Sequence, residues 1–204
     1  MDDTRRPAVR VIRAGEWREH KALRLAALRD PVAHLAYAET YEAAAAQPDA
    51  FYQARTAGAA AGGTAVRQFV AEVSGQQGVW AGSATVLMEE AGEKDFLGRP
   101  ITCRQGQVVG VFVRPEYRGS GLVEELFEAA VAWAYERGAE RVRLYVHERN
   151  ERAIRAYRRL GFEPSGVRVP KGADDVELEF VLAKAWGQPY RCRHGKTEGP
   201  WPAP

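Results

Sequence analysis

The sequence predicts a mixed α/β fold with about six or seven strands and helices packed on the sheet. Three observations support this fold class. The segment at 107–113 is nearly all apolar, as is typical of a strand buried on both faces. It begins the first of two strand-helix units late in the chain, and strand-like runs at 68–73 and 80–88 enclose a turn, which predicts an antiparallel hairpin. The strand at 107–113 is therefore expected at the centre of the sheet.

Ahead of the hairpin, residue alternation and helix-breaking residues predict one strand and three helices. Apolar and polar residues alternate at the start, and an amphipathic pattern follows. Pro48 divides an Ala-rich stretch into two short helices, because proline suits the first turn of a helix. The expected elements are a strand at 9–13, a helix from Trp17 that closes before Pro31, two short helices between Tyr37 and about Thr56, and a flexible break at 58–63.

After the hairpin, strands and helices alternate. Leu122, Leu126 and Phe127 share one side of the first predicted helix, and Gly138 is expected to end it in the left-handed conformation. Asn150 is a good N-cap for the second helix. The expected elements are a loop or an extension of the hairpin arms at 89–106, the strand at 107–113, a helix at 122–137, a strand at 141–146, a helix at 151–160, and strands near 166–169 and 176–182.

Length and composition are those of one globular domain. The chain has 204 residues, of which 46% are hydrophobic and 27% are charged. We expect a single domain at 9–183 and a flexible N-terminus at 1–8. Pro and Gly recur at 184–204 without an apolar period, which predicts an extended or disordered tail. The domain is expected to be a monomer or a homodimer.

Charge and hydropathy exclude several kinds of partner. The net charge is only +2, so no general attraction for nucleic acid is expected. No apolar run of 18 residues and no secretory signal are present, so we predict a cytoplasmic protein without a membrane partner. Cys192 and His194 bring two possible metal ligands together, but two ligands do not make a closed zinc site, and no metal is expected.

The turn at 114–123, between the central strand and the next helix, has the features of an anion site. Gly119 and Gly121 let the backbone approach a ligand, and the first N–H groups of the helix suit a phosphate. Arg118 adds a positive charge. A plain β-α turn, in which both glycines serve geometry only, is the alternative. The turn also lacks the third glycine of a dinucleotide-binding motif and the Gly-Lys-Ser/Thr of a P-loop, so it does not select a cofactor by itself.

Together with a second segment, this turn resembles the GNAT superfamily of N-acetyltransferases. The segments that carry the resemblance are the strand Val111-Phe112-Val113, the turn Arg118-Gly119-Ser120-Gly121, and the helix with Asn150, Tyr157 and Leu160-Gly161-Phe162. They occur in the family's order and at its typical separation, and the detailed match covers about 107–163. The resemblance implies the GNAT fold, with a mixed, mostly antiparallel central sheet and flanking helices, and acetyl-CoA as co-substrate.

The resemblance also implies roles for single residues. Val111 and Val113 would pair through their backbones with the pantetheine amides, and Asn150 would support the pantetheine arm. Tyr157 would face the thioester sulfur. Val123 departs from the family, which has a small residue at that position. The implied cofactor-binding set is Val111, Phe112, Val113, Arg118, Gly119, Ser120, Gly121, Leu122, Val123 and Asn150.

The implied function is the direct transfer of an acetyl group from acetyl-CoA to an amine of a small molecule or peptide in a ternary complex. Tyr157 would act as the general acid. A phenol with a reference pKa of about 10 protonates a thiolate with a pKa of about 8.5 only if it is well positioned. The oxyanion would bind a backbone N–H near Val111, where relatives have a bulge that splays two strands apart.

Several alternatives stay open from the residues alone. Tyr157 also fits a packed aromatic on the inner face of its helix. The general base is Glu72, Glu39, Glu42 or a water chain. Acidic residues of the early helices and of the loop at 170–175 would suit a cationic amine. A GNAT-fold module that binds acyl-CoA without turnover is the alternative function.

Overall fold

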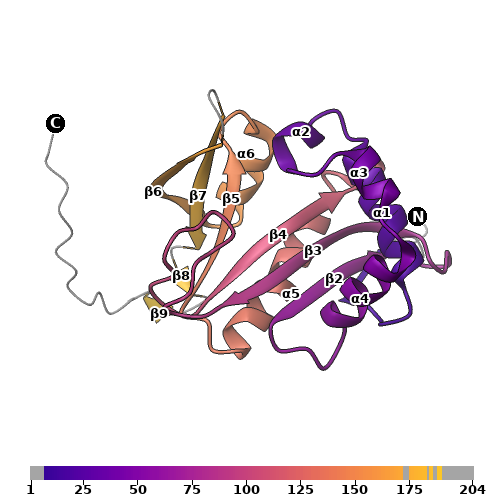
Figure 1. The fold of residues 1–204 in the computed structure, drawn as a ribbon, viewed down its shortest axis with the longest axis horizontal. Helices are drawn as coiled ribbons and strands as arrows, with labels where there is room; N and C mark the ends of the chain where they lie inside the picture. The colour runs from indigo at the N-terminus through magenta and orange to yellow at the C-terminus, as the bar shows by residue number, and fades with distance from the viewer. Residues whose placement is uncertain (1–6, 172–174, 183, 186–187, 190–204) are drawn as a thin grey trace, which may run out of the picture.

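The computed structural model describes residues 7–171, 175–182, 184–185 and 188–189 (Figure 1). The helices are α1 (Trp17–Leu28), α2 (Ala33–Ala36), α3 (Tyr41–Ala46), α4 (Asp49–Ala59), the short 3-10 helix η2 (Pro115–Tyr117), α5 (Leu122–Glu136) and α6 (Glu151–Arg159). The strands are β1 (Ala8–Val11), β2 (Val66–Glu72), β3 (Trp80–Glu89), β4 (Gln105–Val113), β5 (Arg141–His147), β6 (Phe162–Pro170), β7 (Val176–Leu182), β8 (Lys184–Ala185) and β9 (Gln188–Pro189).

Strands β1 to β7 form one sheet in the order β1-β2-β3-β4-β5-β7-β6. Every neighbouring pair is antiparallel except β4 with β5, which is parallel. The prediction of a mixed, mostly antiparallel sheet with flanking helices is therefore confirmed, and β4 is its central strand. In the predicted tail, β8 pairs with β9, and residues 190–204 lie outside the described part of the chain.

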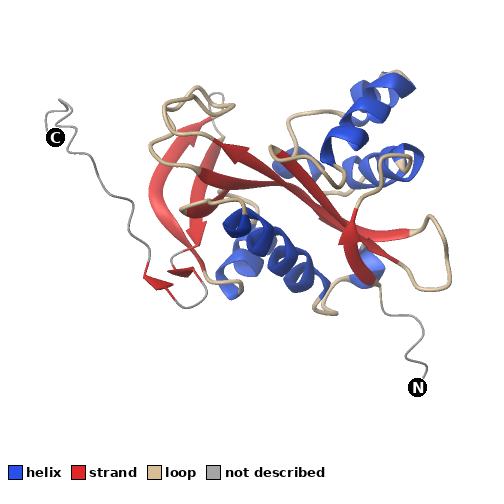
Figure 2. Cartoon of the chain, turned by 90° about the horizontal axis from the view of Figure 1, so that it is seen from below, coloured by secondary structure: helices blue, strands red, loops and turns tan. Residues whose placement is uncertain are grey.

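Helices cover both faces of the sheet (Figure 2). Helix α5 packs on one face through Leu126, Phe127 and Ala130, each at most 2% exposed, and α6 joins the same core. On the other face, α1 and α4 enclose a second core that contains Leu23 and Val70. The sheet alternation assigns these faces, because successive side chains of a strand point to opposite sides.

Three local predictions differ from the structure. Helix α2 was not predicted, because four residues carry no periodic pattern. The expected break at 58–63 is wrong at its start, since α4 continues to Ala59. Strand β4 is not buried along its whole length: residues 105–108 are buried, but Gly110 is exposed and Val111 and Val113 are half-buried. The apolar end of the central strand therefore opens toward a site.

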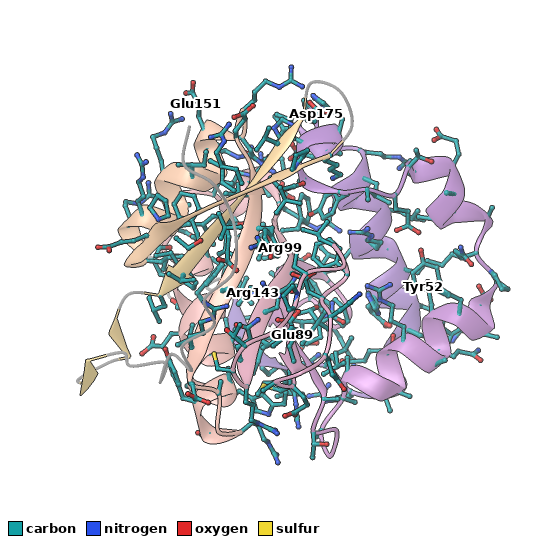
Figure 3. All side chains as sticks on the ribbon, turned by 60° about the vertical axis from the view of Figure 1, so that its left-hand side comes forward. Tyr52, Glu89, Arg99, Arg143, Glu151 and Asp175 are labelled. Atoms are coloured by element: carbon teal, nitrogen blue, oxygen red, sulfur yellow. The ribbon has the colours of Figure 1, made fainter. Side chains whose placement is uncertain are left out.

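A buried ion network holds the long loop at 90–104 against the sheet. Arg143 of β5 is 3% exposed and donates hydrogen bonds to Glu89 of β3, to Asp95 of the loop and to Glu179 of β7 at 2.9–3.0 Å. Figure 3 shows Arg143 and Glu89 side by side on the sheet. Although burial opposes ionisation, hydrogen bonds from Arg99 N–H and Tyr145 hold the pKa of Asp95 below its usual value. The network explains how a polar loop stays ordered over strands.

Candidate functional site

Strands β4 and β5 pair only at one end and then separate. Their parallel pairing covers residues 105–107 of β4 and 141–143 of β5. Further along β4, Val109 pairs with Thr85 and Phe112 with Ser83, so two residues of β4 face Ala84 alone. This is a β-bulge at Gly110 and Val111, and a bulge bends its strand. The expected bulge that splays two strands near Val111 is present in the structure.

The bulge leaves the backbone of β4 open on the side of β5. Ser83 pairs with Phe112, and the Arg114 N–H donates to the Ala81 carbonyl at 2.8 Å. Because alternate residues of an antiparallel strand face the partner, the backbone groups of Val111 and Val113 point away from β3 into the gap. An extended ligand with amide groups has donors and acceptors to pair with there.

A cavity of about 480 Å³ occupies the gap, and we call it the β4–β5 cavity. Every residue of the predicted site except Ser120 lines it, so segments that are far apart in sequence meet around one cavity. Helix α2 lines it through Ala33 and Ala36, and α2 lies next to α6 in Figure 1. The predicted residues that line it are Val111, Phe112, Val113, Arg118, Gly119, Gly121, Leu122, Val123, Asn150 and Tyr157.

The glycines of the turn have the conformation that an anion site needs. Gly119 and Gly121 have φ angles of 77° and 86°, in the left-handed region, and Gly121 is the N-cap of α5. A Cβ built on either glycine meets no atom within 4 Å, so the backbone faces open space. The N–H groups of the first turn of α5 are therefore accessible to a phosphate. Ser120 is exposed, and its hydroxyl donates to the Tyr117 carbonyl at 2.7 Å.

Arg118 adds a positive charge at the turn, as the sequence predicts, but in the structure this charge is already paired. Its Nε donates to the Val113 carbonyl at 2.9 Å, and its Nη2 donates to Asp30. The Asp30 side chain is 4% exposed and also lies 3.7 Å from Arg152 Nη2. Although burial opposes ionisation, hydrogen bonds from Arg118 and the Val32 N–H hold the pKa of Asp30 below its usual value. Two arginines share one carboxylate, which leaves one positive charge beside the turn.

Asn150 and Tyr157 reach the cavity from α6. The Asn150 side-chain oxygen caps the helix by accepting from the Ala153 N–H at 3.2 Å. The Tyr157 ring is half-buried, with its centroid 5.5 Å from that of Phe127. Burial raises the pKa of Tyr157 above that of an ordinary phenol, so the hydroxyl stays protonated at neutral pH. Its hydroxyl has no hydrogen-bond partner among the described residues, which leaves the proton available to a ligand.

Tyr37 is a site residue that the sequence did not reveal. It follows α2, and its hydroxyl donates to the Val111 carbonyl at 3.0 Å. Burial raises its pKa to about 12. An aromatic residue in an Ala-rich stretch carries no local sign of such a contact, because its partner lies 74 positions away.

Tyr37 and Phe112 also border a second cavity of about 510 Å³, which we call the α1–α4 cavity. It lies between α1, α4 and strands β2 to β4, on the face opposite α5. Figure 3 places Tyr52, one of its lining residues, on this helical side of the molecule. Its other lining residues are His20, Leu23, Arg24, Ala27, Glu39, Phe51, Ala54, Arg55, Gly58, Ala59, Val66, Gln68, Ser83, Thr85, Leu87 and Gly110.

The candidate bases lie in three different places. Glu39 lines the α1–α4 cavity and accepts two hydrogen bonds from Arg24. Glu42 is exposed on α3. Glu72 is hydrogen-bonded to Arg10 at 2.7 Å and lines neither cavity. Of the three carboxylates, only Glu39 borders a cavity that meets the β4–β5 cavity.

Among the described residues, no group of three or more His, Cys, Asp or Glu side chains lies where it could hold one metal ion. Cys192 and His194 lie outside those residues. In the same part of the chain, no helix combines the length and the apolar character needed to cross a membrane.

His20 predicts a pH dependence of stability. It is 7% exposed, and Nδ1 lies 2.8 Å from Thr56 Oγ1. Burial, followed by the charges of Arg55 and Arg24, lowers its pKa from 6.5 to about 4. Because the unfolded chain then binds the proton more tightly, this group should cost up to about 3 kcal/mol of stability as the pH falls from 6.5 to 4.

Urea unfolding at pH 7 and pH 4.5 of the wild type and of His20→Asn measures this loss. The difference between the two proteins isolates His20 from the carboxylates that also titrate in this range. We expect the variant to lose less stability on acidification than the wild type. Equal losses in the two proteins would contradict the buried neutral histidine.

Comparisons with known proteins agree with this architecture. The model of the acetyltransferase (GNAT) family matches residues 17–162. A protein of Bacillus subtilis (strain 168), whose name assigns it to the N-acetylation of an alanine of a ribosomal protein, is 36% identical over 87 residues. That match covers 43% of this chain and 58% of the relative, so the chain spans little more than half the length of this relative.

Two solved structures share the fold. An acetyltransferase of the GNAT family from Streptococcus pneumoniae superimposes with a TM-score of 0.64 at 17% identity, covering 85% of this chain and 97% of that one. An N-acetyltransferase from Thermoplasma acidophilum in complex with coenzyme A gives a TM-score of 0.61 at 14% identity, covering 84% and 96%. At these identities the likeness concerns the fold alone.

Proposed function

The chain belongs to the acetyltransferase (GNAT) family, and from this premise we propose that it transfers an acetyl group from acetyl-CoA to an amine. The observation that carries the proposal is the β4–β5 cavity. It joins an open strand edge, a glycine turn at a helix N-terminus and a protonated tyrosine in one space. Each matches one part of a thioester of coenzyme A: the pantetheine amides, the diphosphate and the sulfur.

The residues of the cavity fit this donor along its length. The N–H groups at the start of α5 and the positive charge left by Arg118 and Arg152 would bind the diphosphate. The backbones of Val111 and Val113 would pair with the pantetheine amides. Their carbonyls already accept from Tyr37 and Arg118, and a carbonyl oxygen can accept a second hydrogen bond. Asn150 would contribute its side-chain amide.

The reaction is a direct transfer in a ternary complex. The lone pair of the amine forms the new bond to the thioester carbonyl carbon, and the Val111 N–H would stabilise the negative charge that develops on the carbonyl oxygen. The bond from carbon to sulfur then breaks, and the Tyr157 hydroxyl gives its proton to the departing thiolate. The amine loses its extra proton to Glu39 or to water. The products are an amide and free coenzyme A.

Acetyl-CoA should raise the melting temperature of the protein. A ligand at a hundred times its dissociation constant stabilises the native state by about 2.7 kcal/mol, which corresponds to roughly 5–10 °C for a chain of this size. A thermal-shift titration to millimolar acetyl-CoA measures the effect, with adenosine as a control that lacks the diphosphate and pantetheine. No shift with acetyl-CoA would overturn the donor assignment.

Release of free coenzyme A separates an enzyme from a binding module. A thiol reagent detects the product while acetyl-CoA is offered a panel of polyamines, aminoglycosides, amino acids and peptides with free N-termini. Release that depends on the amine supports the transferase. Stabilisation by acetyl-CoA with no release against the whole panel would instead indicate a protein that binds acyl-CoA without turnover.

A further inference from the structure

The α1–α4 cavity has an excess of positive charge. Three of its lining side chains carry formal charge: Arg24, Arg55 and Glu39. Glu39 Oε2 accepts from Arg24 Nε at 3.1 Å and from Arg24 Nη2 at 2.9 Å, so this carboxylate is already paired. Arg55 has no carboxylate partner among the described residues, and its guanidinium lies 5.9 Å from the ring centre of Phe51. The net charge of the lining is therefore positive.

The positive field reaches the inner wall of the cavity. His20 lies there, 7% exposed, and after burial the charges of Arg55 and Arg24 are the causes that lower its pKa to about 4. The imidazole is therefore neutral at physiological pH and adds no cation of its own. A protonated cationic group of a ligand would be repelled by Arg55 and Arg24 in the same way, whereas an anionic group would be attracted.

Most of the remaining wall is apolar. Side chains such as Leu23, Phe51, Tyr52, Leu87 and Phe112 form it, and Gln68, Ser83 and Thr85 supply a few uncharged polar groups. A volume of about 510 Å³ is that of a site for a small molecule. Such a wall suits a ligand with an apolar body and one charged end.

The α1–α4 cavity meets the predicted donor at the bulge of β4. Gly110 lines the α1–α4 cavity and Val111 lines the β4–β5 cavity, while Tyr37 and Phe112 border both. An amine that reaches the thioester from this side must pass Gly110. The space beside Gly110 is open: its φ is 61°, and a Cβ built there would meet no atom nearer than Thr85 Oγ1, at the ordinary contact distance of 3.9 Å.

We propose that the α1–α4 cavity binds the acceptor, and that the acceptor is an amine with a mainly apolar body and a carboxylate, which Arg55 binds with the help of Arg24. This inference rests on the proposed acetyl transfer and names its substrate class. Of the acidic residues that suggested a cationic amine from sequence, Glu39, Glu42 and Asp175 do not oppose it, and Asp174 lies outside the described residues. Glu39 is paired with Arg24, Glu42 is exposed on α3, and Asp175 is paired with His147 and Arg149.

Matched pairs of amines test the charge preference. L-Leucine is compared with 3-methylbutylamine and L-phenylalanine with 2-phenylethylamine, because the members of each pair share the same apolar body and differ by the carboxylate; spermidine serves as the polycation. Since the carboxylate also lowers the pKa of the amine, kcat/KM is expressed per concentration of unprotonated amine. We expect kcat/KM to be at least about ten-fold higher for the carboxylate member of a pair, as for a hydrogen bond to a charged group. Equal values within the pairs, or spermidine as the best acceptor, would overturn the inference.

Variants of Arg55 locate the effect. Arg55→Gln should lower kcat/KM about ten-fold for the carboxylate amines and change the matched amines little, mainly through KM. Arg55→Glu should reverse the preference within each pair. Arg18 is exposed on α1 and stacks on Trp17 outside the cavity, so Arg18→Gln is the control and should change neither class.

Direct binding keeps the test independent of turnover. Calorimetry measures the affinity of N-acetyl-L-leucine and of N-(3-methylbutyl)acetamide, with and without coenzyme A. Tighter binding of the acid, lost in Arg55→Gln, supports the inference even if no turnover is seen. No difference between the two amides overturns it. Acetylation of a polycation with normal acetyl-CoA binding would leave the transferase intact and refute only the acceptor class.

Discussion

Gly121→Asp is expected to abolish acetyl-CoA binding in a protein that remains folded. Gly121 caps α5 with a φ of 86°, and a Cβ at this position meets nothing within 4 Å, so the new side chain fits without a clash. It would place a carboxylate among the N–H groups that are proposed to bind the diphosphate. Repulsion between charges a few Å apart should weaken binding by roughly a hundred-fold or more.

Gly121→Asn is the matched control, because it has the same size and tolerates the left-handed conformation equally well. Any cost of the conformation is therefore shared by the two variants, and only the charge differs. Calorimetric titration with acetyl-CoA should show a much smaller loss for Asn than for Asp. Wild-type affinity in a folded Gly121→Asp protein would disprove the diphosphate assignment.

The parts of the fold that the sequence predicts well are those with local signals. Strand β4 follows from its continuous apolar run, and helix α5 follows from apolar periodicity. Helix α6 follows from its Asn150 N-cap, and both helices are ended by glycines, Gly138 and Gly161, with φ angles of 81° and 85°. Helix α2 has no such signal. It contacts β5, and its four residues are held by packing between segments that are distant in sequence.

The candidate site also has features with a local sequence signal and features without one. The glycine turn could be found because its chemistry lies in one short segment. The pairing of Arg118 with Asp30 could not, because the two residues are 88 positions apart and meet only in the folded chain. The α1–α4 cavity was hidden for the same reason, since α1, α4 and three strands enclose it. Its charge depends on which carboxylates are paired, and composition does not contain that information.

The role proposed for Tyr157 depends on its hydroxyl more than on its ring. The ring packs against Phe127 and Phe162, with centroids 5.5 and 6.5 Å away, and this packing needs no oxygen. Burial raises the pKa of the Tyr157 phenol, so its hydroxyl is protonated at neutral pH, where the protein would be assayed. A proton donor with these properties should lose its function when the oxygen alone is removed.

Tyr157→Phe should therefore lower kcat by roughly ten- to a thousand-fold and leave the affinity for acetyl-CoA nearly unchanged. The Phe side chain keeps the contacts with Phe127 and Phe162, so the melting temperature should stay close to that of the wild type. Tyr135→Phe is a useful control, because it removes the hydroxyl of a tyrosine of α5 that lines neither cavity. Single-turnover rates, measured with the best acceptor at saturating acetyl-CoA, separate the chemical step from product release. A Tyr157→Phe variant that keeps the wild-type single-turnover rate would show that water protonates the thiolate, and that Tyr157 only packs the core beneath the site.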